Sequence, residues 1–295
     1  MLKLQGIFLP IATPFDYQGE IYRVKVLHNV EKWNLVKLAG YVVCGSTGEG
    51  VHLSNEEKLK VWGLVAEAKA EGRLLLAASG CESVRETVAL TNQAAELGYQ
   101  AAVIRTPHYY RGLVGEAEAQ ELYFRTVADQ VKIPVVLYNW PQATGVDLAV
   151  ESIARLSEHP NIIAIQDNSG DAGKVARIVR AAKKEFQVLA GSAPSLWPAL
   201  DNGAAGAVLG FANAAPYACI TIWEAHRTRE REAALDWQTR IERPAELLAS
   251  KYGIAGLKHA MDLNGYYGGP CRLPLRPLNP AGKAEIEQAF DGIRG

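Results

Sequence analysis

The segment NIIAIQDNSGD, residues 161–171, is the starting point for interpreting the whole sequence. Four apolar residues in succession are followed by asparagine, serine, glycine and aspartate, a pattern that predicts a short buried strand running into a turn. Because side chains alternate along a strand, one face of this strand should carry Gln166 together with Ile162, Ala164 and Asn168.

Two roles fit Gln166. If its face of the strand points into a barrel, the amide stands at the C-terminal mouth, where the active sites of such barrels lie. Alternatively, the side chain only caps the end of the strand by hydrogen bonding. This segment alone does not separate the two roles, so the other strand ends have to be considered.

The composition fits a globular protein with a large core. The chain has 295 residues, of which 48% are hydrophobic and 21% charged, and its formal net charge is -1. This length suits one α/β barrel or two smaller domains. The near-neutral charge gives no electrostatic footprint for nucleic acid, and no apolar run is long enough to span a bilayer. We therefore expect neither nucleic acid nor a membrane as a partner.

Four widely spaced cysteines, Cys44, Cys81, Cys219 and Cys271, form no C-x-x-C pair. They lack the spacing of metal ligands and are expected to be reduced, mostly buried thiols. With no signal-peptide pattern at the N-terminus, we expect a cytoplasmic protein. A mitochondrial matrix location stays open, because a transit peptide could have been removed.

Short apolar runs recur about every thirty residues, roughly the length of one βα unit. They cover residues 7–12, 40–44, 74–78, 101–105, 134–138, 162–165, 187–190 and 205–210. Stretches rich in Ala, Glu, Leu and Lys separate most of them, for example 55–70, 84–97, 116–130, 149–157 and 172–184. Ser54 followed by Glu57 is a capping-box signature for the first of these helices.

Strands that alternate with helices in this way predict an α/β fold, specifically a (β/α)8 TIM barrel. The competing architecture is a doubly wound open sheet, which usually has a glycine-rich phosphate turn after its first strand, and residues 13–16 (TPFD) are no such turn. After Asn213 the pattern changes to helices, around 218–227, 231–250 and 256–263, and a proline-rich tail at 270–280. We expect a barrel over residues 1–213 and a C-terminal helical extension over 214–295, packed on the barrel.

Functional residues of such a barrel lie at the C-terminal ends of its strands. The second predicted strand is followed by GSTGEG, residues 45–50. Glycines let the backbone approach a ligand, and the amides and hydroxyls of Gly45, Ser46 and Thr47 are suited to binding an oxyanion. The turn lacks the lysine of a nucleotide-binding P-loop, so we do not expect nucleotide binding.

Tyrosines, but no cluster of metal ligands, mark other strand ends. The fourth strand is followed by TPHYYRG (106–112), and the fifth ends at Tyr138. Such tyrosines can relay protons or orient a carbonyl, or they can pack at a subunit contact. His108 fits a loop residue better than a base. A pocket lined by Ser, Thr, Tyr and amides, for which we expect no metal and no cofactor, suits a small oxo-acid.

Taken together, six segments resemble the dihydrodipicolinate synthase / N-acetylneuraminate lyase family of pyruvate-handling aldolases. They are GSTGEG (45–50), LLLAASGCES (74–83), TPHYYRG (106–112), PVVLYNWP (134–141), FQVLAGSA (186–193) and GLKHAMDLNGYYGGPCR (256–272). They extend over nearly the whole chain in family order. Within the family, the chain is most similar to the 4-hydroxy-2-oxoglutarate aldolases, which cleave their substrate to pyruvate and glyoxylate.

The resemblance implies a (β/α)8 barrel with a C-terminal helical extension, commonly assembled as a homotetramer built from dimers. It implies that Ser46 and Thr47 bind the carboxylate of pyruvate and that Tyr138 relays a proton. A second tyrosine, which reaches into the site from the neighbouring subunit, corresponds to Tyr110 or Tyr109. The resemblance also implies that the ligand is a small, pyruvate-like 2-oxo acid.

The sequence departs from the family at the essential nucleophile. The family lysine that forms a Schiff base with pyruvate is Gln166 here, and an amide nitrogen cannot form an imine. Residues 142–145 (QATG) also lack the arginine with which the synthases hold their second substrate. Three interpretations stay open: an aldolase whose lysine was replaced, a paralogue that binds or senses an oxo-acid, or a reaction in which Gln166 polarises a carbonyl while Tyr138 moves the proton.

Overall fold

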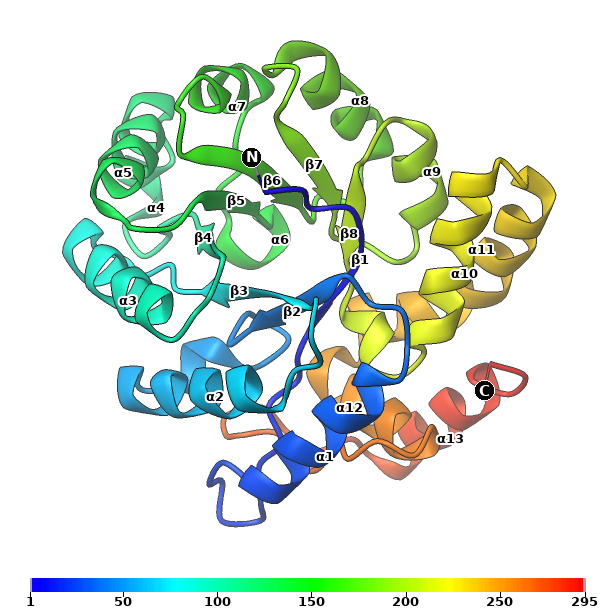
Figure 1. Cartoon of the computed structure of the whole chain (residues 1–295). Helices are drawn as coiled ribbons and strands as arrows, with labels where there is room; N and C mark the ends of the chain where they lie inside the picture. The colour runs from blue at the N-terminus through cyan, green and yellow to red at the C-terminus, as the bar shows by residue number, and fades with distance from the viewer. Residues whose placement is uncertain (1, 294–295) are drawn as a thin grey trace.

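A computed structural model describes residues 2–293 of the chain (Figure 1). Within these residues, parallel strands close into a barrel in which each strand pairs with its neighbours in chain order and β1 pairs with β8. The strands are β1 (Gly6–Pro10), β2 (Gly40–Val43), β3 (Leu74–Ala78), β4 (Ala101–Arg105), β5 (Val135–Asn139), β6 (Ile162–Asp167), β7 (Gln187–Ala190) and β8 (Gly206–Val208). The predicted (β/α)8 TIM barrel is confirmed.

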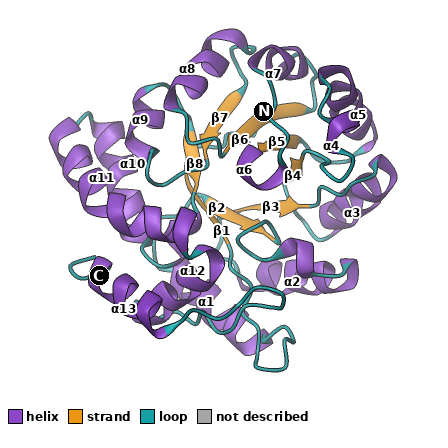
Figure 2. Cartoon of the chain, turned by 180° about the vertical axis from the view of Figure 1, so that it is seen from behind, coloured by secondary structure: helices purple, strands orange, loops and turns teal. Residues whose placement is uncertain are grey.

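Helices surround this barrel and continue into a group on one side of it (Figure 2). The helices before Asp201 are α1 (Arg23–Asn34), α2 (Asn55–Ala68), α3 (Val84–Glu96), α4 (Arg111–Val114), α5 (Ala117–Gln130), α6 (Pro141–Thr144), α7 (Val150–Ser157), α8 (Ala172–Ala181) and α9 (Leu196–Asp201). Those that follow are α10 (Pro216–Thr228), α11 (Arg231–Glu246), α12 (Gly253–Leu263) and α13 (Pro280–Ala289). Short 3-10 turns, η1 (Gly50–His52) and η2 (Gly210–Asn213), follow β2 and β8, and a π-helical segment, η3 (Leu247–Lys251), follows α11.

Local sequence signals explain where some of these helices begin. The capping box predicted for α2 is present, since Ser54 accepts from the backbone of Glu57 and the Glu57 side chain accepts from the backbone of Ser54. Helix α13 lies mostly beyond the predicted proline-rich tail and was not expected. Its signal is Asn279, which caps the helix, followed by Pro280 at the first helical position.

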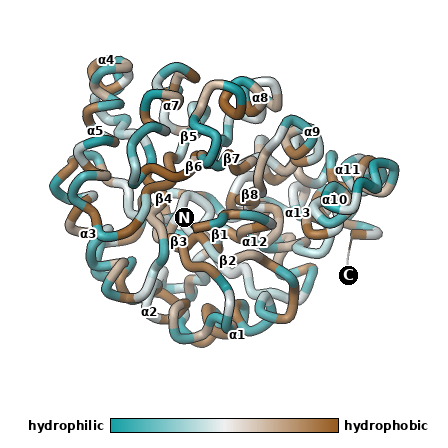
Figure 3. Tube along the Cα trace, turned by 45° about the horizontal axis from the view of Figure 1, so that its top comes forward, coloured by the Kyte–Doolittle hydropathy of each residue, from teal (hydrophilic) through white to brown (hydrophobic). Residues whose placement is uncertain are grey.

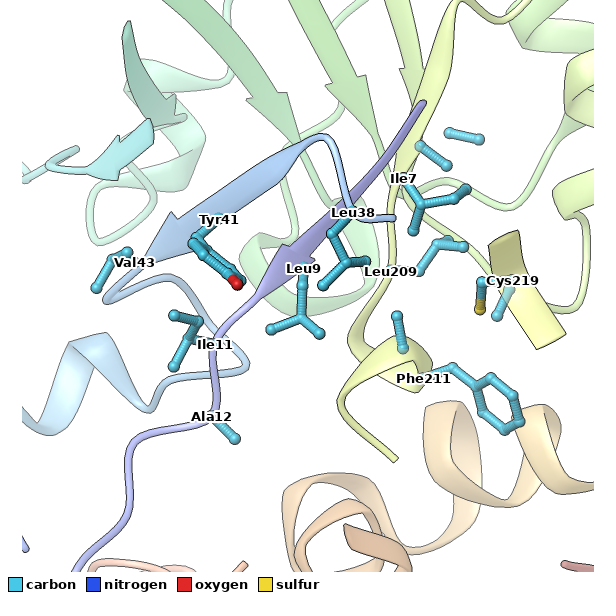
Figure 4. Packing of buried hydrophobic residues seen from close by; sticks show 14 of the residues in the cluster. Ile7, Leu9, Ile11, Ala12, Leu38, Tyr41, Val43, Leu209, Phe211 and Cys219 are labelled. Carbon is cyan, nitrogen blue, oxygen red and sulfur yellow. The ribbon is translucent and has the colours of Figure 1, made fainter. Parts of the chain in front are cut away.

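Apolar side chains form two layers, one inside the barrel and one between the barrel and its helices, so the strands lie in the most hydrophobic part of the trace (Figure 3). Phe8, Val42 and Ala164 belong to the inner layer. The outer layer includes Ile7 and Leu9 of β1, shown with their neighbours in Figure 4. Burial on both faces explains why the strands appear in the sequence as continuous apolar runs.

The predicted alternation of side chains along β6 is wrong for Ile162, which does not share a face with Ala164 and Gln166. Val135 pairs with Ile162 and Val136 with Ala164, so Ile163 is an extra residue in a β-bulge. Ile162 therefore packs in the outer layer, whereas Ala164 packs inside the barrel. Because the bulge precedes Ala164, the face shared by Ala164 and Gln166 is unaffected and still points inward.

The C-terminal helices pack against the barrel. Helix α10 contacts β1 and α9, and α12 contacts η2 at the end of β8. The boundary at residue 213 remains a prediction about domain organisation. In residues 2–293, no helix combines the length and apolar character needed to cross a membrane. All four cysteines are free, and three of them are buried; burial raises the pKa of the Cys44 thiol.

Candidate active site

The sequence-predicted residues of β2, β5 and β6 meet in one cavity at the C-terminal end of the barrel. Its volume is about 230 Å³, and its lining includes Gly45, Ser46, Thr47, Tyr138 and Gln166. The inward register explains this convergence, because Tyr138 and Gln166 are directly paired residues of neighbouring strands. The hydroxyls of Ser46 and Thr47 and the side chains of Tyr138 and Gln166 therefore face the same cavity.

The turn after β2 is held in a conformation that requires its glycines. A Cβ at Gly50 would lie 1.9 Å from the carbonyl oxygen of Cys44, and one at Gly48 would lie 2.6 Å from that of Ile11. Within residues 2–293, the backbone N–H groups of Ser46 and Thr47 have no protein acceptor. Two backbone donors and two hydroxyls are thus grouped at the cavity, which is a suitable arrangement for a carboxylate.

Tyr138 is connected to this turn by a hydrogen bond. Its hydroxyl lies 3.2 Å from Ser46 Oγ, and either atom can be the donor. Burial raises the pKa of the Tyr138 phenol, an effect that the hydrogen bond with Ser46 only partly offsets. The phenol is therefore protonated at neutral pH, and the pair of hydroxyls can pass a proton without forming a free phenolate.

Gln166 is the first member of a chain of hydrogen bonds along the cavity wall. Its Nε2 donates to Asn168 Oδ1 over 2.8 Å, and Asn168 Nδ2 donates to the carbonyl of Gly191 over 3.0 Å. A backbone carbonyl only accepts, so it fixes the orientation of the Asn168 amide and hence that of Gln166. Gln166 thus retains one N–H and its carbonyl oxygen for a ligand.

Residues that face away from the cavity hold β5 and β6 together. Asn139 Nδ2 donates to Asp167 Oδ1 over 2.7 Å and to Asp147 Oδ1 over 2.8 Å. Lys174, which is almost fully buried, forms ion pairs with both of these carboxylates. Because this network occupies the outer face of the strands, Lys174 lies on the side opposite Gln166 and cannot replace the missing lysine in the cavity.

Charged side chains attach the C-terminal extension to the glycine-rich turn at residues 45–50, called the glycine turn below. Lys258 Nζ lies 2.7 Å from Glu49 Oε1 and donates to the carbonyl of Pro270. Arg272 binds Glu57 with two nitrogens, at 2.6 and 2.9 Å, and its backbone N–H donates to Glu49 Oε2. These contacts connect the turn that carries Ser46 to residues more than two hundred positions later in the chain.

Tyr109 and Tyr110 do not join the cavity of their own chain. Their side chains are 76% and 68% exposed and pack edge-to-face against each other, with ring centroids 5.0 Å apart. His108 lies beside Glu82, as expected for a loop residue. A contribution of either tyrosine to the cavity of a neighbouring subunit remains a prediction.

Other lining residues were not identified from the sequence. The strand pattern predicts Asn168 on the inward face, but no sequence signal indicates its role. The C-terminal extension supplies a further part of the lining, with Ala245, Leu248, Ala249, Gly253, Ile254 and Leu257. These are apolar or small residues of a kind common in helices. No sequence signal distinguishes those that line a cavity from those that only pack against another helix. Within residues 2–293, no three His, Cys, Asp or Glu side chains gather in a group that could hold a metal ion.

Comparison with known proteins agrees with this geometry. The profile of the dihydrodipicolinate synthetase family matches residues 3–292. The chain belongs to this family. Family members are lyases, which supports a lyase-type enzymatic function for the chain.

Relatives within the family have more than one activity. The chain is 35% identical to the 4-hydroxy-tetrahydrodipicolinate synthase of Methanothrix thermoacetophila, with 97% of this chain and 96% of the relative covered. It is 34% identical to a protein of Emericella nidulans named "Probable 4-hydroxy-2-oxoglutarate aldolase, mitochondrial", over 97% and 93% of the two chains. Among solved structures, a dihydrodipicolinate synthase of Bacillus anthracis superimposes with a TM-score of 0.93 at 27% identity, covering 99% of both chains.

Proposed function

We propose that this member of the family is a carbon–carbon lyase that acts on a small 2-oxo acid and works without an imine. The observation that carries this proposal is the grouping of Ser46, Thr47, Tyr138 and Gln166 around one cavity of metabolite size. In this group, Ser46 and Thr47 provide hydrogen-bond donors for a carboxylate, the protonated phenol of Tyr138 can relay a proton, and the amide of Gln166 has a fixed orientation. The described residues that line the cavity include no lysine, the nucleophile of imine chemistry.

The substrate would be held by its carboxylate and its carbonyl. The hydroxyls and free N–H groups of Ser46 and Thr47 would bind the carboxylate, each charge-assisted hydrogen bond contributing about 1.5–3 kcal/mol. The remaining N–H of Gln166 would donate to the 2-oxo oxygen. Because Asn168 fixes the direction of this N–H, the carbonyl is polarised without a reorganisation of the amide.

The reaction that suits this arrangement is a retro-aldol cleavage of a 4-hydroxy-2-oxo acid. In one concerted step, the hydroxyl on C4 gives its proton to one hydroxyl of the Ser46–Tyr138 pair while the other hydroxyl of the pair gives a proton to the 2-oxo oxygen; the C3–C4 bond breaks, and an aldehyde forms at C4. The bonding electrons form the C2–C3 double bond of the enol of pyruvate, whose oxygen accepts a hydrogen bond from Gln166. The same hydroxyl pair then accepts the enol proton as it gives a proton to C3, so pyruvate forms and neither protons nor electrons are gained or lost.

Two measurements test this proposal. Calorimetry with pyruvate should detect binding in the millimolar range, about -4 kcal/mol, and acetate should give clearly less heat. A coupled assay should detect pyruvate released from a 4-hydroxy-2-oxo acid, and borohydride should not inhibit that release. Equal, negligible heats for pyruvate and acetate would contradict the proposal.

A second candidate is a protein that binds or senses a 2-oxo acid without cleaving it. Gln166 favours this alternative, because an amide stabilises an enolate less than a protonated imine does. Binding of pyruvate without any turnover of 4-hydroxy-2-oxo acids would select this function. In either case we propose a homotetramer, since the exposed pair Tyr109 and Tyr110 suits a subunit contact.

A further inference from the structure

The cavity is lined without a charged side chain. Among the described residues that surround it, none is Asp, Glu, Lys, Arg or His. The donors grouped at Ser46 and Thr47 can satisfy one carboxylate. A second charged group on the same ligand would be taken from water without a partner, which is strongly unfavourable.

Apolar side chains form much of the remaining lining, and the part of it that the C-terminal extension supplies around Leu248, Ile254 and Leu257 is called the apolar wall below. Leu248 and Leu257 come from the C-terminal extension and are 8% and 4% exposed, and Ile254 lies between them in the sequence. Trp140 after β5 and Phe211 after β8 add aromatic surface. A hydrocarbon group seated here would leave water and lose no hydrogen bond.

The shape of the backbone brings this wall to the cavity. Pro244 near the end of α11 lacks an N–H, and the following turn is π-helical, with the N–H of Tyr252 donating to the carbonyl of Leu247 over 2.9 Å. The wider turn places both Leu248 and Ala249 at the cavity. Single π-helical turns occur frequently at functional sites, which is a second reason to assign the wall to the ligand.

Charged residues nearby belong to a different space. A second cavity, of about 370 Å³, shares Ser46 and Tyr138 with the first. Its charged lining residues are Lys58, Glu82, Glu86 and Arg105, of which Glu82 and Arg105 form an ion pair at 2.6 Å. Lys58 lines only this second cavity. Glu86, a further carboxylate there, accepts from the amide of Asn55. Arg105, which already has this partner, therefore does not supply a free cation to the first cavity.

We propose that the substrate carries a short hydrocarbon group on the side remote from its 2-oxo-acid end, seated against Leu248, Ile254 and Leu257. This inference rests on the proposed function, because it takes the carboxylate to be bound at Ser46 and Thr47. Cleavage would then release pyruvate and an uncharged aliphatic aldehyde. The group is short because the cavity of 230 Å³ is small compared with ligand pockets of about 300–1,000 Å³.

A ligand series tests the inference by calorimetry. Pyruvate, 2-oxobutanoate and 2-oxopentanoate add one methylene at each step, and 2-oxoglutarate adds a second carboxylate instead. The affinity should rise about fourfold per methylene, the ratio that corresponds to about 0.8 kcal/mol, and 2-oxoglutarate should bind more weakly than pyruvate. Tighter binding of 2-oxoglutarate than of 2-oxopentanoate would overturn the inference.

A matched pair of variants tests the wall itself. Ala249 lines the cavity and has an exposed side chain, so Ala249→Lys can place a cation at the wall without disturbing the core. This variant should bind 2-oxoglutarate about tenfold more tightly than the unmodified chain, the ratio that corresponds to the low end of the range for a charge-assisted hydrogen bond. Ser250→Lys is the control, because the adjacent Ser250 is exposed, bonds to the carbonyl of Glu246 and lies outside the lining.

The outcomes separate this inference from the function on which it rests. If no 2-oxo acid binds better than acetate, the proposed function fails. If pyruvate binds better than acetate but the affinity does not rise from pyruvate to 2-oxopentanoate, only the apolar substrate class fails. An equal gain of 2-oxoglutarate affinity in the Ser250→Lys control would also contradict the wall assignment, because the effect would then be one of overall charge.

Discussion

Gly191 and Asn168 are packed so closely that a Cβ at position 191 would lie 1.7 Å from Asn168 Oδ1. The same oxygen accepts the hydrogen bond from Gln166, and the amide nitrogen of Asn168 donates to the Gly191 carbonyl. Gly191 directly follows β7. Because it has no side chain, Asn168 fits beside it and holds the amide of Gln166, at the end of β6, in a fixed orientation.

The first prediction concerns the variant Gly191→Ala. Its methyl group should displace Asn168 and release Gln166 from its fixed direction. We expect the affinity for pyruvate to fall about fivefold, the ratio for one hydrogen bond of about 1 kcal/mol, as measured by calorimetry. Gly63→Ala is the control, because a Cβ there has no neighbour within 4 Å. Unchanged pyruvate affinity in Gly191→Ala would show that the amide chain does not act on the ligand.

The second prediction concerns Tyr138→Phe. Loss of the hydroxyl should lower turnover by about 10²–10⁴-fold, the range for a positioned proton donor or acceptor, with a smaller change in pyruvate affinity. Burial raises the pKa of Tyr138, whereas the unfolded phenol ionises near pH 10. The associated stability is fully present below about pH 10 and is lost as the pH rises further. The free energy of unfolding should therefore fall more steeply at high pH in the unmodified chain than in the variant.

A second buried tyrosine provides the control for this variant. Tyr99 donates to the carbonyl of Trp62, lies outside the cavity lining, and has a pKa that burial also raises. Tyr99→Phe should reproduce the change in alkaline stability but leave turnover intact. Equal loss of turnover in both variants would mean that Tyr138 acts through stability and not as a proton relay.

The third prediction concerns the buried ion pair that attaches the C-terminal extension to the glycine turn. The side chains of Lys258 and Glu49 are 1% and 0% exposed. Lys258→Met leaves a buried carboxylate without its cation and should lower the free energy of unfolding by about 3–5 kcal/mol, measured by urea denaturation. Adding Glu49→Gln should restore part of this loss. The exposed Lys251→Met is the control, expected to change stability by less than about 1 kcal/mol.

The barrel could be predicted from the sequence because its physical signals are local and repeated. Strands buried on both faces appear as continuous apolar runs, and the ends of such strands carry the polar residues of the site. Tyr138 and Gln166 close consecutive strands, so their meeting follows from the topology. The bulge at Ile163 could not be predicted, because residues 162–165 are all apolar and either register buries them.

The apolar wall of the cavity could not be predicted for a different reason. Leu248 and Ile254 occupy positions that a packing face of any helix would fill with the same residue types. Only the π-helical turn at 247–251 and the approach of the extension to η2 bring them to the cavity. The glycine at 191 was visible in the sequence, but its partner Asn168 follows from the pairing of β6 with β7, which no local pattern contains.

The fourth prediction concerns assembly. If Tyr109 or Tyr110 completes the cavity of a neighbouring subunit, a Tyr109→Phe/Tyr110→Phe chain and a Tyr138→Phe chain should each be impaired alone. Mixed oligomers of the two would contain some intact sites, so activity should reappear after subunit exchange. Sedimentation should show a tetramer. A clean monomer at micromolar concentration, or mixed oligomers without recovered activity, would remove the shared site from the mechanism.

The fifth prediction isolates one functional group. Gln166→Lys places an amine beside Tyr138, close to the donors of Ser46 and Thr47. Burial disfavours the charged form and lowers the pKa of such a lysine, so more of it is nucleophilic at neutral pH. The variant should condense with pyruvate, borohydride should trap the adduct, and mass spectrometry should locate it at position 166. It should also cleave 4-hydroxy-2-oxo acids by an imine route, and the dicarboxylate 4-hydroxy-2-oxoglutarate should be cleaved to pyruvate and glyoxylate less efficiently than a substrate with an aliphatic end.

The unmodified chain is the matched control for this experiment, because it contains two buried lysines outside the cavity. Lys174 pairs with Asp147 behind β5 and β6, and Lys258 pairs with Glu49. Neither lines the cavity, so treatment with pyruvate and borohydride should modify neither. An adduct in the variant alone would mean that the pocket retains every other component of imine chemistry. A folded variant without an adduct would mean that the pocket has diverged beyond this residue, and the binding function would then be favoured over the lyase.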